Sequence, residues 1–296
     1  MKNSCFVFVL MVLIVNCFYI CAMNDEATWN NNICGVPVYT FEHDTDKLFA
    51  YAKMGKLEEL EKELKKFEVN HQGPLRRTVL HYAVEGGQME AVRYLVEEKE
   101  ANVNVKDTLF KECPLHIALR YKFYNIAEYL VEYGADVNED SDYGLPLNII
   151  AQKGRFVQYG ADILEDVKNN DIADLEMAQL LIEKGGAHVN NVHEGFYELL
   201  NETPLQTAVN YNQFELACYL IKEKKAVVNL KNGGAEPLSI AILRKNKKMI
   251  ELLVEEGSAF IESDYISDER SSNDIQEYLK RKLKEKNEEE SGCQIL

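Results

Sequence analysis

The chain has 296 residues, of which 46% are hydrophobic, and it carries a formal net charge of −16. A surface this acidic argues against non-specific nucleic-acid binding, which requires Lys and Arg to neutralise phosphates, and it suits a basic partner or simply solubility. The seven cysteines show neither metal-binding spacing nor the density of a disulfide framework, so we expect no metal site and no cofactor.

Residues 1–22 have the features of a secretory signal peptide. Lys2 precedes the apolar run Cys5–Val15, and Ala22 is a small residue at a suitable cleavage position. An uncleaved signal anchor is the alternative, because the apolar stretch approaches the roughly 20 residues that a bilayer requires. The positive-inside tendency would then place the rest of the chain on the non-cytoplasmic side. We therefore expect a secreted or secretory-pathway protein, with a polar lead-in over residues 23–46.

The next segment, residues 45–70, predicts a short helix pair. Leu57, Leu60 and Leu64 lie on one helix face, and Glu and Lys fill most of the other positions. This pattern is typical of an end of a helical stack, where one side of the helix must meet water.

A clearer pair follows at residues 112–138. Pro114 suits the first helical position, and a second helix is expected from about Asn125. Gly134 then ends that helix, because glycine accepts a left-handed C-cap without a Cβ clash. Neither helix is long enough to be stable alone in water, so each must bury its apolar face against a neighbour.

The opening of this unit recurs along the chain. The openings read TVLHYA at 78–83, CPLHIA at 113–118, LPLNII at 145–150, TPLQTA at 203–208 and EPLSIA at 236–241. Successive openings are 35, 32, 58 and 33 residues apart. Together with closes such as YLVEYGADVN, they resemble the ankyrin repeat, whose period is about 33 residues. The resemblance implies an all-α solenoid over residues 47–261, with about five to seven helix-turn-helix repeats, eroded ends included, joined by β-turn or hairpin fingers.

The resemblance also implies a class of function. Ankyrin arrays bind other macromolecules, so it implies a monomeric, non-catalytic scaffold that holds a protein partner with its fingers and concave face. The rival is an enzyme or toxin with repeats attached. Outside the array only about 24–46 and 262–296 remain, which are too short for a catalytic core and hold no catalytic arrangement of Ser, His, Cys or Asp. We therefore expect no catalytic residues.

His81 and His116 in the openings invite a metal-ligand or general-base interpretation. The equivalent positions of the other repeats hold Asn148, Gln206 and Ser239, which share polar bonding but no ligand or base chemistry. We therefore expect both histidines to bond loop backbone in their own or the adjacent repeat.

The step of 58 residues marks an irregular insertion at about 154–174. FVQYGAD at 156–162 nearly copies LVEYGAD at 130–136, which favours a fused, truncated extra repeat. In that interpretation Ile163–Asn169 forms a substitute first helix and Leu175–Glu183 a second one. The alternative is a single repeat with an insertion between its two helices.

The fingers between repeats carry exposed aromatic residues in this interpretation. Phe110, Tyr143, Phe196 and Tyr197 are the candidate partner contacts, because aromatic side chains are enriched at the centres of interfaces. Packing of these residues back on their own helices is the alternative for each one. Asn201 begins the glycosylation sequon Asn-Glu-Thr, although Thr203 also suits a helix cap.

Residues 262–296 predict a charged helix and tail that close the stack. The chain ends in CQIL, which matches the prenylation pattern with Cys293 as the modified residue. Prenylation is cytosolic and conflicts with a signal peptide, unless an exported protein is delivered into a host cell and lipidated there. The alternative function is therefore a host-directed effector or adaptor tethered to a membrane, which would need a second signal for stable attachment.

Overall fold

The fold is that of a computed structural model, which describes residues 44–152, 171–193, 202–231, 235–267 and 271–292. Across these ranges the chain forms fourteen α-helices and no strand. Most of the helices form six consecutive pairs: α2 (Asp44–Met54) with α3 (Leu57–Leu64), α4 (Val79–Glu85) with α5 (Met89–Arg93), α6 (Pro114–Arg120) with α7 (Tyr124–Glu132), α8 (Pro146–Ala151) with α9 (Asp171–Glu183), α10 (Pro204–Asn210) with α11 (Phe214–Lys222), and α12 (Pro237–Leu243) with α13 (Lys247–Glu251). The predicted all-α solenoid is confirmed.

Short helical turns and two further helices complete the described chain. A 3₁₀ turn, η1 (Pro74–Arg76), precedes the second pair, and π-helical turns η2 (Tyr94–Glu98) and η5 (Leu252–Glu256) extend α5 and α13. The last helices are α14 (Ser263–Ser267) and α15 (Asn273–Gly292).

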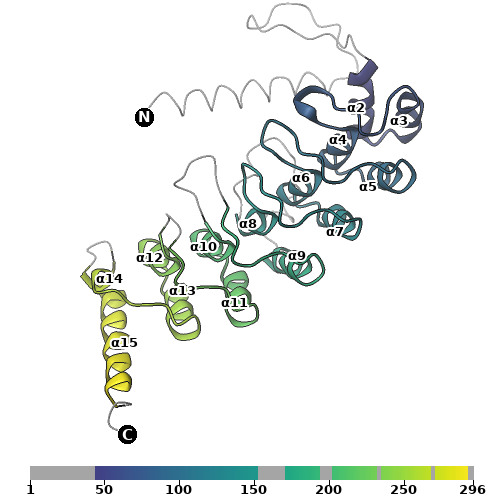
Figure 1. The fold of residues 1–296 in the computed structure, drawn as a ribbon. Helices are drawn as coiled ribbons and strands as arrows, with labels where there is room; N and C mark the ends of the chain where they lie inside the picture. The colour runs from purple at the N-terminus through teal and green to yellow at the C-terminus, as the bar shows by residue number, and fades with distance from the viewer. Residues whose placement is uncertain (1–43, 153–170, 194–201, 232–234, 268–270, 293–296) are drawn as a thin grey trace, which may run out of the picture.

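The pairs stack into two parallel columns (Figure 1). The first helices α2, α4, α6, α8, α10 and α12 pack one on the next, and the second helices α5, α7, α9 and α11 form the other column. The fingers connect the repeats along the first-helix side of the gently curved stack. We call the surface formed by the first helices and fingers the inner face.

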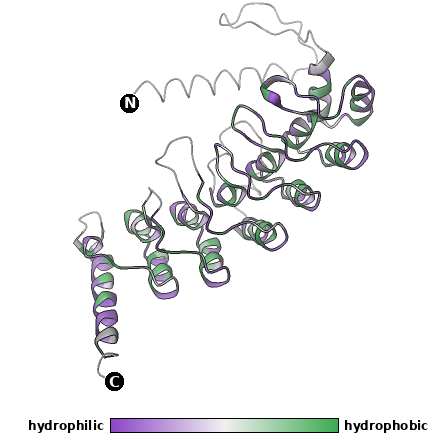
Figure 2. Cartoon of the chain, in the orientation of Figure 1, coloured by the Kyte–Doolittle hydropathy of each residue, from purple (hydrophilic) through white to green (hydrophobic). Residues whose placement is uncertain are grey.

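Each opening contributes one leucine to the core. Leu80, Leu115, Leu147, Leu205 and Leu238 are all exposed by 1% or less. Burying one such side chain contributes about 1.5–3 kcal/mol, and helices of five to nine residues depend on that contribution because they are unstable alone. Figure 2 shows the resulting pattern, with hydrophobic residues in the paired helices and hydrophilic residues along the connecting loops.

Both ends of the stack are closed as their sequences indicate. In α3, Leu60 and Leu64 are buried, while Glu58 and Glu59 belong to its acidic first turn. The C-terminal helix α15 buries Ile275, Tyr278 and Leu279 near its start. Each end helix therefore has one apolar face for the stack and charged residues for solvent.

The described residues of the irregular step form one helix pair, α8 with α9. Helix α8 packs directly between α6 and α10, and α9 packs on α8 and lies between α7 and α11. One layer is described within the 58-residue step, and residues 153–170, which distinguish the truncated repeat from the insertion, lie outside the described residues. The proposed substitute helix Ile163–Asn169 lies outside the described residues. Helix α9 begins at Asp171, so the last part of the expected 154–174 insertion is helical.

Candidate interaction surface

A row of polar side chains ties each finger to the preceding repeat. The third residue of four first helices bonds a main-chain carbonyl that precedes the next first helix. The contacts are His81 Nε2 with Glu112 O (3.3 Å), His116 Nε2 with Glu139 O (2.9 Å), Asn148 Nδ2 with Glu202 O (3.1 Å) and Gln206 Nε2 with Ala235 O (2.9 Å). The described parts of these four fingers are thereby tied to the repeat before them, whereas Ser239 at the equivalent position bonds the Glu236 carbonyl of its own repeat.

The surroundings of His81 show why this position has a structural role and is not a metal ligand or general base. Its Nδ1 accepts the Thr78 main-chain N–H at 3.0 Å, and its Nε2 faces the Glu112 carbonyl, so both ring nitrogens are engaged. Burial, together with the nearby charge of Arg77, lowers the pKa of His81 to about 3. The imidazole therefore stays neutral and bonded, which confirms the predicted structural role. His116 repeats the arrangement, with Cys113 Sγ 2.8 Å from its Nδ1 in the place of the threonine hydroxyl.

A second row links the closing asparagines of successive repeats. The side-chain oxygen of one asparagine accepts a main-chain N–H from the next close. The pairs are Asn70 with Asn102 (2.8 Å), Asn104 with Asp136 (2.9 Å), Asn138 with His188 (2.8 Å), Asn190 with Val227 (2.8 Å) and Asn229 with Phe260 (2.8 Å). A hydrogen bond of this kind contributes about 1 kcal/mol, and the regular row fixes the spacing between layers.

Polar braces also cross the inner face within single repeats. The residue before the helix cap pairs with the residue eight positions later, at the C-terminal end of the first helix. The braces are Arg77 with Glu85 (3.0 Å), Glu112 with Arg120 (2.8 and 3.0 Å) and Glu202 with Asn210 (3.3 Å). In the fourth repeat Gln152 donates to the Tyr143 carbonyl at 2.9 Å. These braces were not predicted from the sequence, although Arg and Glu exchange places at the same spacing of eight residues in two repeats.

Two of the four predicted contact residues lie together on adjacent fingers. The rings of Phe110 and Tyr143 have centroids 4.8 Å apart, and the Phe110 carbonyl accepts the Asp142 N–H at 2.8 Å. The Arg120 guanidinium lies 5.3 Å from the Tyr143 ring centroid. Both aromatic side chains are half-buried, so each packs against its neighbour and still presents part of its ring at the surface.

The remaining predicted site residues lie outside the described part of the chain. Phe196, Tyr197 and Asn201 belong to the finger before α10, and Cys293 lies beyond α15. The leader, residues 1–22, is also outside it. Among the described helices, none is both long enough and apolar enough to span a bilayer.

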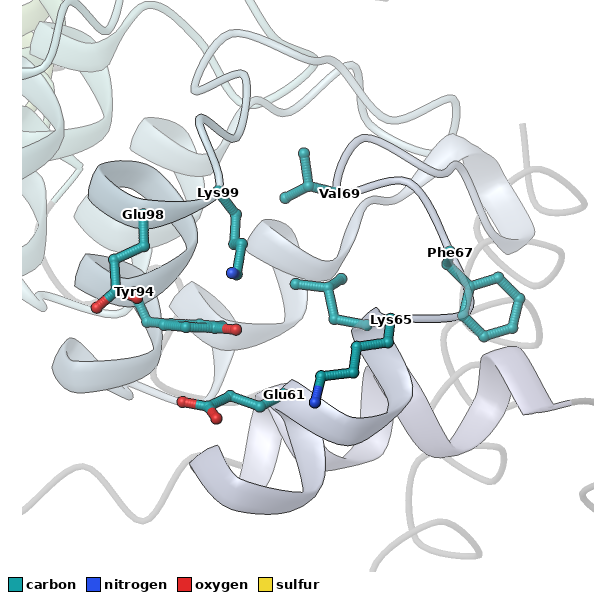
Figure 3. Close-up of a pocket in the computed structure, with 8 residues that line it drawn as sticks. Glu61, Lys65, Phe67, Val69, Tyr94, Glu98 and Lys99 are labelled. Atoms are coloured by element: carbon teal, nitrogen blue, oxygen red, sulfur yellow. The ribbon is translucent and has the colours of Figure 1, made fainter.

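A pocket of about 400 Å³ lies at the N-terminal end of the stack, between α3 and η2 (Figure 3). Its rim carries two acidic and two basic side chains, Glu61, Lys65, Glu98 and Lys99. Leu64, Phe67, Val69 and Tyr94 complete the lining. The opposite charges on the rim balance each other, and the lining contains no Ser, Cys or His that could act as a nucleophile or base. In the described ranges no group of three or more His, Cys, Asp or Glu is placed to hold a metal ion.

Comparisons with known proteins agree with this architecture. The family described as Ankyrin repeats (3 copies) matches residues 48–141 and 167–264. An ankyrin repeat protein of Rickettsia felis is 36% identical over 112 residues, which cover 37% of this chain and 41% of that protein. Ankyrin repeat protein FPV031 of fowlpox virus is 29% identical over 197 residues, covering 64% of this chain and 50% of that protein.

A solved structure has the same fold. The human ASB11 ankyrin repeat domain superposes with a TM-score of 0.58 at 21% identity, covering 79% of this chain and 96% of that one. The chain spans half or less of the length of the curated relatives that it matches.

Proposed function

Because the chain belongs to the ankyrin repeat family, we propose that it is a non-catalytic binding protein whose fingers and inner face hold a protein partner. The observation that carries the proposal is the polar row from His81 to Gln206, which ties four fingers to the repeats before them. A surface ordered in this way loses little conformational entropy on binding, so more of the contact energy appears as affinity.

The fingers supply the contact residues in this proposal. Phe110 and Tyr143 form one half-buried aromatic pair at the surface. Phe196 and Tyr197, which lie outside the described residues, belong by sequence to the longest finger and are side chains of the same class. Aromatic side chains contribute large contact areas at low entropic cost, and they are enriched at the centres of interfaces.

Affinity capture with the full chain as bait tests the proposal. We expect a captured partner to be weakened or lost with the double variant Phe196→Ser, Tyr197→Ser, while circular dichroism shows an unchanged helix content. The matched control is Tyr133→Ser, since Tyr133 is a half-exposed aromatic residue that caps the C-terminal end of α7 in the second-helix column. Equal capture by the folded double variant and the wild type would count against the finger contacts.

We further propose that the protein is exported, with residues 1–22 acting as a signal peptide or anchor. The apolar run after Lys2 supports this proposal. A mature protein that begins near Met23 is the expected result of intact-mass spectrometry on secreted material. A full-length, cytosolic product would overturn it.

A membrane-tethered effector or adaptor is the second candidate, and the C-terminal CQIL favours it. Geranylgeranylation of Cys293 would add one prenyl group to its thiol. The same intact-mass measurement decides the question, because an unmodified C-terminus at Leu296 removes this candidate.

A further inference from the structure

One position on the inner face changes character in the last repeat. The end of the first helix holds Glu85, Arg120, Gln152 and Asn210 in four repeats, and each of these side chains bonds within its own repeat. In the sixth helix pair the equivalent residue is Leu243, whose side chain is 55% exposed. Its pairing position, eight residues earlier, is Ala235, which cannot form a polar brace. An apolar side chain is therefore exposed at the position where four other repeats have a hydrogen-bonded polar side chain.

The residues directly after Leu243 are basic. Arg244, Lys245, Lys247 and Lys248 are all exposed; the first two lie between α12 and α13, and the last two begin α13. Only Lys247 has a carboxylate within 4.0 Å in the described part of the chain, namely Asp274 at 3.9 Å, and both of those side chains are more than half exposed. Four nearly uncompensated positive charges thus lie together on a chain whose net charge is −16.

Neighbouring side chains of the preceding repeat join this patch. Arg244 donates two hydrogen bonds to Asn210 Oδ1, at 3.2 and 2.7 Å, so its guanidinium is positioned beside α10. The Lys248 ammonium lies 3.8 Å from the centroid of the Phe214 ring, at the start of α11. Arg244 and Lys248 are therefore positioned by a neutral amide and an aromatic ring of the preceding repeat, neither of which cancels their charge.

We propose that Leu243, Arg244, Lys245, Lys247 and Lys248 form a docking patch for an acidic protein segment that carries a large apolar side chain. The proposal rests on the proposed binding function and specifies the chemistry of the partner. Acidic side chains of the segment pair with the four cations, and its apolar side chain covers Leu243. Charge complementarity favours this occupant, because the patch has the opposite sign to the chain as a whole. Arg also presents a planar fork of donors that suits carboxylates.

The test uses fluorescein-labelled peptides and the full chain, read by fluorescence anisotropy. The probe is EDEELFEDEE, and its polar counterpart is EDEESSEDEE. We expect the first peptide to bind more tightly than the second and to weaken as salt is raised, because exposed ion pairs are screened. The variant Leu243→Asn installs the residue type found at position 210. It should lower the affinity for the first peptide by about tenfold, which corresponds to about 1.4 kcal/mol of apolar burial, and leave the affinity for the second peptide unchanged.

Charge reversal gives the second arm. Lys245→Glu with Lys248→Glu should weaken the binding of both peptides by about tenfold, because each reversal replaces an attraction to the peptide carboxylates by a repulsion. The matched control is Lys225→Glu with Lys280→Glu, two exposed lysines at other places in the stack. Equal effects of the two double variants, or no measurable binding of either peptide, would overturn the docking patch.

The outcomes also separate this proposal from the proposed function. If the captured partner is lost with Phe196→Ser, Tyr197→Ser but is unaffected by Leu243→Asn and the Lys245, Lys248 variant, the docking patch fails and the binding function stands. If peptide binding depends on the patch while the finger variant captures normally, the finger contacts fail and the patch stands. Tighter binding to phosphatidylserine vesicles or to an RNA oligonucleotide than to either peptide would overturn an acidic protein as the occupant.

Discussion

The substitution His81→Gln keeps the hydrogen bonds of this side chain but removes its titratable group, so it separates the two contributions of His81 to stability. The imidazole is fully buried and accepts the Thr78 N–H at 3.0 Å while it contacts the Glu112 carbonyl. Gln206 makes the equivalent pair of contacts in the fifth repeat, with Thr203 N at 2.7 Å and Ala235 O at 2.9 Å. We therefore expect His81→Gln to cost less than about 1 kcal/mol at pH 7, and His81→Ala, which leaves the Thr78 N–H without its acceptor, to cost about 2 kcal/mol.

The same substitution changes the pH dependence of stability. The folded imidazole keeps a pKa of about 3, whereas the unfolded chain takes up a proton below the ordinary value of 6.5. Because the unfolded state binds the extra proton, the free energy of unfolding falls as the pH drops from about 6.5 toward 3. Between pH 7 and pH 4.5 the loss from His81 is about 2.5 kcal/mol, at about 1.4 kcal/mol per pKa unit.

Urea denaturation of the wild type and His81→Gln at both pH values measures this loss. Contributions from other titrating groups are shared by the two proteins and cancel in the difference. We expect the wild type to lose about 2.5 kcal/mol more than the variant on acidification. An equal loss in both proteins would refute the buried, neutral imidazole, and so would a variant that is as unstable as His81→Ala at pH 7.

Three further substitutions test the packing between layers. In the wild type the Lys122 ammonium lies 2.9 Å from both Asp174 carboxylate oxygens, and Asp174→Ala removes this buried counter-charge. We expect urea denaturation to show a loss of about 3 kcal/mol in the free energy of unfolding. An unchanged free energy of unfolding would show that the pair does not hold α9 on the stack. Gly134→Ala should cost only about 1 kcal/mol, because its φ of +84° is unfavourable for alanine but no atom lies within 4 Å of the added Cβ. Gly86→Ala should cost more than Gly134→Ala in thermal denaturation, since its Cβ would lie 2.0 Å from the Lys53 carbonyl oxygen; the reverse order would contradict the close contact of α2 with α4.

Local signals in the sequence predicted most of the fold. The openings place a buried leucine in each of five first helices, and Gly134 has the left-handed conformation that its position indicated. These features depend on residues close together in the chain, so their physical requirements can be recognised in the sequence.

Contacts between layers were harder to predict. The resemblance of FVQYGAD to an earlier close is local, and it could not indicate that α8 packs directly on α10. The exposure of Leu243 depends on a missing partner at Ala235 and on the comparison of equivalent positions across repeats. Such features emerge only when the neighbours of each helix are known, because the same residue is buried or exposed according to what covers it.

Hydrogen-exchange mass spectrometry of the full chain, alone and with its captured partner, tests the central claim most directly. We expect added protection in the fingers and along α4, α6, α8, α10 and α12, where the inner face lies. We expect little change along α5, α7, α9 and α11, which support that face from the other column. Added protection confined to the second helices would contradict binding at the inner face.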